Sequence, residues 1–266
     1  VCLPNHLHVE STVQALNGGR HVLVEKPMAP TEGEARKMAA AAEAAGKILV
    51  TAQSRRHSSA IRYVQDNAAK FGRLRSIEAS FCMYWAGPQA PWWRDRTPEQ
   101  GLVLSQLGSH TLDFVQMMMG HQPTRVHAEA VRWRDCWAAD DEAMILLRYP
   151  ENRLASVHIS YDQQPFHERY HLFYDGCVVE VRDVNTVLIN DEVVHRPPQG
   201  EDATQLVTNE LFRNQFAEFA AAVQGKPNRS ALHPQGVALT RVIDAALRSA
   251  LNGHTIELSW PVQTAA

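Results

Sequence analysis

The fold class is indicated by the stretch His21-Val22-Leu23-Val24-Glu25-Lys26-Pro27, an apolar run that leads directly into a charged pair and a proline. The apolar residues predict a buried strand. Open α/β sheets bind ligands at the carboxyl ends of their strands, so this strand would place the Lys26 ammonium at such an edge. Pro27 also restricts the backbone of Lys26. Lys26 is therefore a candidate functional residue, and the alternative is a surface lysine at the end of a strand.

The segments on either side of this stretch alternate between strand and helix patterns. Thr31 and Glu34 have the spacing of a capping box at the start of a helix. Short connections between strands and helices favour a parallel sheet with right-handed crossovers. We expect strands at 1–3, 21–24 and 48–52, with helices at 8–17 and 32–45 between them.

The pattern changes after Gln53, and the rest of the chain predicts an α+β arrangement. We expect helices at 58–70, 102–119, 208–224 and 234–252, a loop at 86–100, and strands at 74–83, 125–134, 141–149, 153–161, 169–174, 177–182, 186–189 and 255–258. The predicted fold is the C-terminal half of a Rossmann-like parallel sheet, followed by an open, mainly antiparallel sheet with helices on one face. Residues 1–56 would form the first domain and residues 57–266 the second, with the last helix packing back on the first.

Composition excludes several classes of function. The 266 residues are 45% hydrophobic and 21% charged, with a formal net charge of -3. That charge offers no basic field for nucleic acid or an anionic membrane, and no apolar run approaches the ~18 residues of a transmembrane helix. The four cysteines are scattered, which favours reduced thiols in a cytoplasmic protein. The histidines have no metal-ligand spacing with carboxylates or cysteines, so we expect no metal site.

A second group of candidate residues lies within the predicted helix at 102–119. Gln106, His110 and Asp113 are spaced i, i+4 and i+7, so they share one face of a helix that is otherwise strongly apolar. A polar stripe on a buried helix indicates the lining of a cavity. Gly108 costs about 1 kcal/mol relative to alanine inside a helix, which predicts a close approach by another group. The alternative is a core histidine bonded to Asp113 or to a backbone carbonyl.

These motifs together resemble the Gfo/Idh/MocA family of oxidoreductases, which includes glucose-fructose oxidoreductase and inositol dehydrogenase. The order and spacing of the motifs hold across the whole chain. The matching segments are Pro4-Asn5-His6-Leu7-His8 for a Thr-Pro-Asn-x-x-His turn, His21–Pro27 for a Glu-Lys-Pro signature, Gln53–Arg56 for a segment ending in arginine, and Gly108-x-His110-x-x-Asp113 for the helix that faces the nicotinamide.

The resemblance implies an activity and an organisation for this chain. A Rossmann domain would bind NAD or NADP, and the second domain would supply the substrate pocket. The reaction would be hydride transfer at a secondary alcohol or carbonyl of a sugar or cyclitol. The open sheet of the second domain would form a homo-oligomer. We expect a small carbohydrate-like substrate as partner, and neither nucleic acid nor a membrane.

The resemblance also implies roles for individual residues. Lys26 would hydrogen-bond the reacting oxygen, and His110 would relay the proton. Gln106 completes the catalytic set at a position where many relatives carry aspartate. The residues expected beside the cofactor are Pro4, Asn5, His8, Glu25, Lys26, Pro27 and Gln53, and those expected beside the substrate are Arg56, Trp93, Arg94 and Asp113.

Two departures from the family pattern concern the chemistry. Gln106 can position a hydroxyl, but an amide cannot exchange a proton or hold an imidazolium by charge. The family's Gly-x-Gly-x-x-Gly turn does not occur in this sequence. The chain begins inside a predicted strand, so we expect that turn upstream of Val1, within about 60 further residues or two units of about 30. A chain without that turn would lack the helix N-terminus that binds the pyrophosphate.

Two other functions fit the same residues. The chain could be a family member that has lost catalysis and acts as a binding or assembly protein, which Gln106 and the absent glycine-rich turn favour. It could also be a glycoside hydrolase that uses NAD for transient oxidation, as some relatives do. The sequence does not specify the sugar, the reaction direction, or the choice of NAD over NADP, because the residue that reads the ribose follows the glycine-rich turn.

Overall fold

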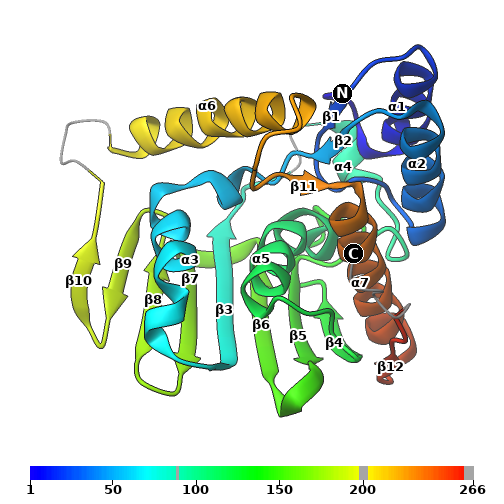
Figure 1. The fold of residues 1–266 in the computed structure, drawn as a ribbon. Coiled ribbons are helices and arrows are strands. Elements are labelled where there is room, and N and C mark those ends of the chain that lie inside the picture. Colours follow the sequence, from blue (N-terminus) through cyan, green and yellow to red (C-terminus); the bar gives the residue numbers. More distant parts are fainter. Residues whose placement is uncertain (88–89, 198–202, 261–266) are drawn as a thin grey trace.

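The computed structural model describes residues 1–87, 90–197 and 203–260. Within these residues the strands form two sheets, one of three strands and one of nine (Figure 1). The small sheet carries the first helices of the chain, and the large sheet forms most of the rest of the fold. The predicted fold class is confirmed.

The first segment of the chain supplies two of the three strands of the small sheet, together with the helices that flank them. The 3-10 helix η1 (Asn5–Leu7) and α1 (His8–Asn17) precede β1 (Val22–Val24), and α2 (Glu32–Ala45) leads to β2 (Leu49–Thr51). β1 and β2 pair in parallel. The α2 capping box forms as expected, because Thr31 Oγ1 accepts a bond from the Glu34 amide and donates one to its carboxylate. Both carboxyl ends of the parallel strands therefore lie at one edge, where Lys26 and Gln53 follow.

The large sheet is mixed, with one parallel pair at its centre. β3 pairs in parallel with β6 and antiparallel with β7, and the remaining neighbours are antiparallel. The strand order is β10-β9-β8-β7-β3-β6-β5-β4-β12. The bounds are β3 (Leu74–Tyr84), β4 (Arg125–Val131), β5 (Glu142–Arg148), β6 (Leu154–Ser160), β7 (Asp162–Tyr174), β8 (Val178–Arg182), β9 (Thr186–Ile189), β10 (Glu192–His195) and β12 (Ile256–Glu257).

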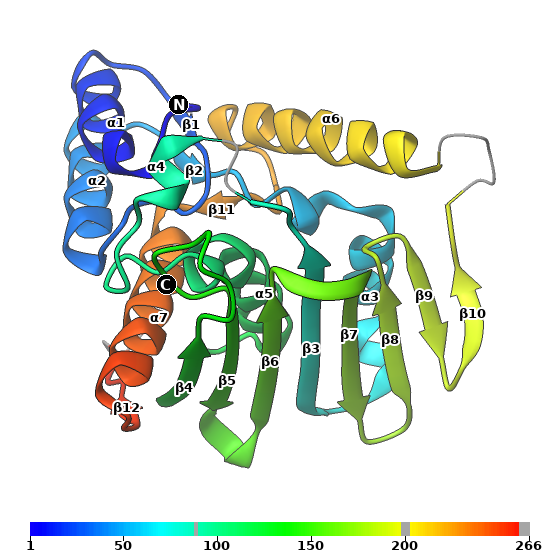
Figure 2. The same ribbon diagram turned by 180° about the vertical axis from the view of Figure 1, so that it is seen from behind.

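Helices cover one face of the large sheet and leave the other face open (Figures 1 and 2). The covering helices are α3 (Ser59–Phe71), α5 (Val103–Met119) and α7 (His233–Asn252), while α6 (Ala203–Val223) crosses one end of the sheet. α7 also contacts α2 and β2, so it joins the two sheets. No helix in the described part of the chain is long and apolar enough to cross a membrane.

The central helix α5 is buried along almost its whole length. Gly108 allows this close packing, since a Cβ there would lie 3.3 Å from Ile159 Cδ1 on β6. On the other side, the Phe114 ring stacks on Tyr170 of β7 with centroids 3.9 Å apart. Burial on all sides fixes the axial position of α5, and with it the polar residues that α5 carries.

The structure corrects several predicted element boundaries. Residues 1–3 form no regular strand, although Val1 exchanges two backbone hydrogen bonds with Leu23 and Glu25 beside β1. β4 ends at Val131, before the predicted 134, because the next backbone N–H groups of Trp133 and Arg134 donate to the Asp141 carboxylate and leave the ladder.

Other corrections concern elements that were missed or shortened. β7 begins at Asp162, seven residues before the predicted start, and α6 begins at Ala203. The loop at 86–100 contains the short helix α4 (Pro91–Arg94), and its residues 88–89 lie outside the described residues. β10 was not predicted, and neither was β11 (Ala231–Leu232), which pairs antiparallel with β2.

Gly236 of α7 controls how closely this helix approaches the small sheet. A Cβ at Gly236 would lie 2.6 Å from both Met28 Sδ and Thr51 Oγ1. We expect Gly236→Ala to lower the free energy of unfolding by about 1–3 kcal/mol, because overpacking outweighs the gain in helix propensity. Gly33→Ala in α2, where a Cβ meets nothing within 4 Å, is the matched control and should stabilise by up to about 1 kcal/mol. Urea denaturation followed by circular dichroism measures both, and equal effects would contradict the packing argument.

Candidate active site

Lys26 lies at the carboxyl edge of β1 and reaches across to α5. Its Nζ donates to Gln106 Oε1 at 3.1 Å and lies 3.4 Å from the Gln106 carbonyl oxygen. The Lys26 amide donates to Glu25 Oε2 at 3.2 Å. The ammonium predicted at this edge is therefore held against the polar stripe of α5 by an amide side chain.

The polar residues of α5 face the segments that follow β1 and β2. Asp113 accepts two hydrogen bonds of 2.7 Å from Arg56, which lies in the 3-10 helix η2 (Ser54–His57) after β2. Both partners of this ion pair are buried. The alternative of a His110–Asp113 bond is not realised, because His110 Nδ1 is buried without a hydrogen-bond partner. Arg56 and Asp113 satisfy each other and form a structural link between the small sheet and α5.

The start of α5 is fixed by a residue distant in sequence. The two oxygens of Asp140 accept from the amides of Leu102 at 2.6 Å and Leu104 at 2.9 Å. These are backbone donors that a helix N-terminus leaves without internal partners. Burial raises the Asp140 pKa to about 6, although these bonds favour the charged form. Gly101 turns the chain into the helix with φ of +62°, and a Cβ there would collide with Leu247.

The charge on Lys26 is destabilised by its surroundings. Burial, the largest cause, and the nearby Arg55 guanidinium lower the Lys26 pKa to about 8. Glu25 acts in the opposite direction, and Arg96 adds a smaller decrease. Among the described residues no carboxylate hydrogen-bonds the ammonium, and its partner on α5 is the neutral Gln106. Lys26 is therefore poised to exchange a proton near neutral pH.

His110 is the neutral member of the group. Burial lowers its pKa well below the usual value, and the cations Arg55 and Lys26 add to that effect. A neutral imidazole offers one donor and one acceptor. It can therefore hydrogen-bond a reacting oxygen, but it has no charge with which to stabilise an anion.

Arg55 is a site residue that the sequence reasoning missed. It donates from Nε and Nη2 to the Glu168 carboxylate, at 3.3 Å each, and Glu168 also accepts at 2.6 Å from Tyr170 Oη. The sequence contained the signal in the Arg55-Arg56 pair. With three residues per turn in a 3-10 helix, consecutive side chains point in different directions, so only the fold determines that Arg55 pairs with Glu168 while Arg56 pairs with Asp113.

The residues predicted to border the dinucleotide gather at the edge of the small sheet. Asn5 is buried with Nδ2 unpartnered, and Gln53 donates from Nε2 to the Ser109 carbonyl at 3.3 Å while its Oε1 has no partner. His8 plays a different role, because its ring nitrogens lie 2.8 Å from the Leu3 oxygen and 2.9 Å from the Pro27 oxygen. That histidine ties together the two turns that contain Pro4 and Pro27.

The aromatic loop contributes Trp93 to a cluster of rings, but it does not bring Arg94 to the site. Trp93 meets Trp85 edge to face with centroids 4.2 Å apart, and Trp85 in turn meets Tyr161 at 4.9 Å. The Arg94 side chain is 60% exposed and pairs with its neighbour Asp95. The buried arginine of this loop is Arg96, which the sequence reasoning also missed.

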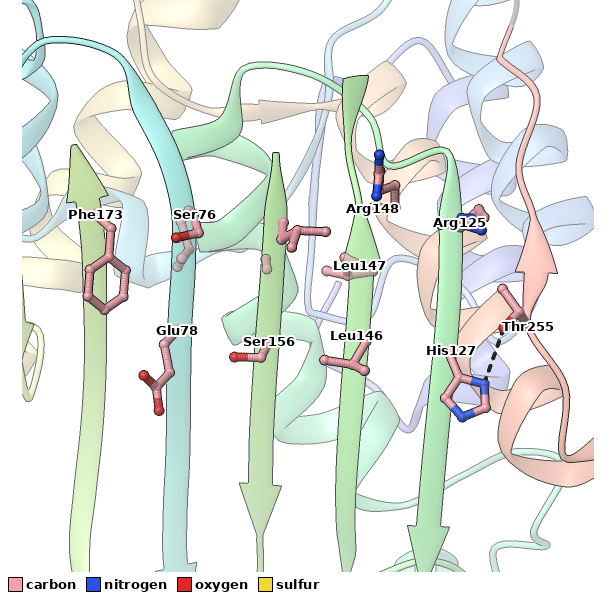
Figure 3. Close-up of a pocket in the computed structure, with 13 residues that line it drawn as sticks. Ser76, Glu78, Arg125, His127, Leu146, Leu147, Arg148, Ser156, Phe173 and Thr255 are labelled. Atoms are coloured by element: carbon pink, nitrogen blue, oxygen red, sulfur yellow. Dashed lines mark hydrogen bonds between the residues drawn. The ribbon is translucent and has the colours of Figure 1, made fainter. Parts of the chain in front are cut away.

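A separate depression lies on the open face of the large sheet, away from these residues. It has a volume of about 650 Å³ and is lined by side chains of β3, β4, β5, β6 and β7 (Figure 3). Leu146, Ser156 and Phe173 project into it from three different strands. None of the candidate catalytic residues lines it, so we assign it no role in the chemistry at Lys26.

Two family models match this chain. One, described as the oxidoreductase family with an NAD-binding Rossmann fold, matches residues 1–53. The other, described as the GFO/IDH/MocA C-terminal domain, matches residues 63–177. The matched segments contain Lys26 in the first case and the polar residues of α5 in the second.

Individual relatives span nearly the whole chain. The chain is 29% identical to 1,5-anhydro-D-fructose reductase of Ensifer adhaerens, covering 97% of this chain and 78% of that protein. It is 26% identical to D-xylose 1-dehydrogenase (NADP(+)) 2 of Haloferax volcanii, covering 96% and 78%. Its fold is similar to the crystal structure of an inositol dehydrogenase homolog complexed with NADH and myo-inositol from Azotobacter vinelandii, with a TM-score of 0.81, 19% identity, and coverage of 96% and 76%.

The pKa of Lys26 can be measured directly. The chain has five lysines, so their side-chain resonances can be resolved by NMR with labelled lysine. We expect one lysine to titrate near pH 8, and Gln106→Asp to raise that pKa, because a carboxylate beside the ammonium favours its charged form. Gln14→Asp, an exposed change in α1, is the control and should leave the titration in place. A Lys26 pKa near 10.5 in the unmodified protein would contradict the proposed environment.

Proposed function

This chain belongs to the Gfo/Idh/MocA family of oxidoreductases, and we propose that it is an NAD(P)-dependent enzyme acting on a secondary alcohol or carbonyl of a sugar or cyclitol. The observation that carries the proposal is the Lys26 ammonium, held at the carboxyl edge of the parallel sheet within 3.1 Å of Gln106 on the same helix as His110. The names of the relatives, a sugar reductase and a sugar dehydrogenase, support this substrate class.

The residues at the edge of the small sheet fit the nicotinamide end of the cofactor. Asn5 Nδ2 and Gln53 Oε1 are buried polar atoms without a partner, one a donor and the other an acceptor. A carboxamide offers the complementary pair of groups. We propose that Pro4, Asn5, Glu25 and Gln53 border the cofactor there, while His8 holds the turns in place. When bound, NAD or NADP supplies the oxidant or reductant of the reaction.

The protein's own part in the reaction is electrostatic and acid–base. In the direction of carbonyl reduction, Lys26 donates a hydrogen bond to the reacting oxygen and stabilises the negative charge that develops on it. The product alcohol needs one proton, and a lysine of pKa about 8 can donate it at neutral pH. Gln106 positions the ammonium through Oε1, and it cannot take the proton. We propose that neutral His110 hydrogen-bonds the same oxygen.

A binding protein without catalysis is the competing function, and Gln106 favours it because it replaces an ionisable residue with an amide. The two functions differ in how they depend on Lys26. If Lys26 is substituted, a loss of turnover without a loss of cofactor binding is expected only of an enzyme.

Substitution of Lys26 tests the proposed activity. With protein expressed from its complete reading frame, we expect NADH or NADPH to bind in fluorescence titrations and sugar-linked turnover to be measurable by nicotinamide absorbance. Lys26→Met should lower kcat by about 100- to 1,000-fold, since it removes the main charge opposite the developing anion. Lys37→Met, at an exposed position of α2, is the control. The proposed enzymatic function would be rejected if the protein bound no dinucleotide, or if Lys26→Met left the activity unchanged.

The open face of the large sheet has the properties of a contact surface between copies of the chain. Met144, Leu146 and Leu154 are 49–59% exposed on adjacent strands. His158 Nε2 lies 2.7 Å from Glu142 on β6 and β5, and His171 Nε2 lies 3.6 Å from Glu180 on the neighbouring strands β7 and β8, so polar and apolar side chains are interspersed on the sheet. We propose that this face forms a homo-oligomer. The four cysteines are all free, which suits a cytoplasmic protein.

A charged substitution on this face tests the oligomer. We expect the protein to sediment as a dimer or larger, and Leu146→Asp to shift it towards the monomer, because an unpaired carboxylate would be buried in the interface. Leu251→Asp on α7 is the matched control, as this leucine is 49% exposed and lies away from the sheet face. A monomeric wild type, or equal effects of the two variants, would contradict the proposal.

A further inference from the structure

Arg96 is a buried cation with a guanidinium donor that has no hydrogen-bond acceptor. It follows α4 in the aromatic loop, and only 6% of its surface is exposed. Its Nη2 lies 3.5 Å from the Gln100 carbonyl oxygen, while its Nη1 is buried without any partner. A buried charged donor without an acceptor is costly, so the functional state of the protein should supply one.

Three buried carboxylates of the candidate site are already engaged by other groups. Asp140 attracts Arg96 electrostatically, but its two oxygens accept from the backbone at the start of α5. Glu168 is shared between Arg55 and the Tyr170 hydroxyl. Asp113 is paired with Arg56 through both of its oxygens. None of these three side chains offers Arg96 a matching pair of acceptors.

The aromatic loop and α5 carry two other buried donors without a partner. Gln106 turns Oε1 towards Lys26, so its Nε2 must point away, and that Nε2 is buried with no acceptor. The indole Nε1 of Trp93, three residues before Arg96, is also buried and unpartnered. Arg96 and Lys26 are close enough for each charge to matter to the other, since Arg96 contributes to the lowered Lys26 pKa. The region therefore has an excess of donors and of positive charge.

We propose that Arg96 determines substrate specificity by binding the carboxylate of an acidic sugar, while Lys26 binds the reacting oxygen of the same molecule. This inference rests on the proposed function and narrows it to sugar acids. A neutral sugar could accept hydrogen bonds from these groups, but it would leave the buried Arg96 charge unpaired.

The geometry favours a carboxylate among the possible anions. A guanidinium presents its donors in a planar fork that matches the two oxygens of a carboxylate. The rings of Trp85 and Trp93 lie edge to face beside this loop, and aromatic faces suit the C–H surface of a pyranose. A phosphate dianion would call for more donors than Arg96 presents through Nη1, which is unpartnered, and Nη2, whose bond to the Gln100 oxygen is long.

Matched pairs of sugars test this specificity. Binding to the dinucleotide-saturated protein, and binding to the protein alone, are titrated by tryptophan fluorescence or calorimetry with D-glucuronate against D-glucose, D-galacturonate against D-galactose, and D-glucose 6-phosphate. We expect at least one sugar acid to bind about 10- to 100-fold more tightly than its neutral partner. Arg96→Gln should remove that preference and leave dinucleotide affinity unchanged, because it removes one charge-assisted pair.

Two further variants separate the specificity role from a folding role. Arg96→Lys keeps the charge without the planar fork, so it should retain part of the preference. Arg75→Gln, a change of a 64% exposed arginine at the start of β3, should leave every affinity as it was. Equal binding of acids and neutral sugars, a preference that survives in Arg96→Gln, or tight binding of the phosphate alone would overturn the inference. Failure to bind a dinucleotide would instead reject the proposed function.

Discussion

The buried ion pair between Arg56 and Asp113 fixes the geometry of this protein's candidate site. Arg56 follows the last parallel strand of the small sheet, and Asp113 lies in the middle of α5 under the large sheet. Two bonds of 2.7 Å join these elements away from water, so either partner alone would be a buried, uncompensated charge. Because the pair sets the register between the sheet edge and the helix, Gln106 and His110 lie opposite Lys26.

The electrostatics of the site follow from this placement. Lys26, Arg55 and Arg96 are brought together, and the carboxylates around them are occupied by structural bonds. Burial and like charges lower the Lys26 pKa and keep His110 neutral. A carboxylate at position 106 would offset this effect, but the chain has an amide there. In the proposed function Lys26, and not His110, exchanges the proton, which reverses the emphasis that the family resemblance suggested.

The fold of the small sheet could be predicted from local signals because its elements are marked at both ends. α1 and α2 begin and end where the sequence predicted, since the Thr31 capping box and the terminal glycines act over a few residues. The large sheet was predicted in type but not in detail. The parallel pairing of β3 with β6 and the two-residue strand β11 depend on partners far away in the chain, and no local pattern encodes them.

The candidate site, too, could be predicted from the sequence only in part. The sequence by itself determined the family, the Glu-Lys-Pro turn after β1, and the polar face of α5, because a turn and a helical spacing are local properties. Only the tertiary structure decided that Arg55 pairs with Glu168 while Arg56 pairs with Asp113, and that Arg96 is buried while Arg94 is exposed. In each pair the residue type is the same, and the difference lies in the partner or the burial of each arginine, which arises from how distant segments pack together.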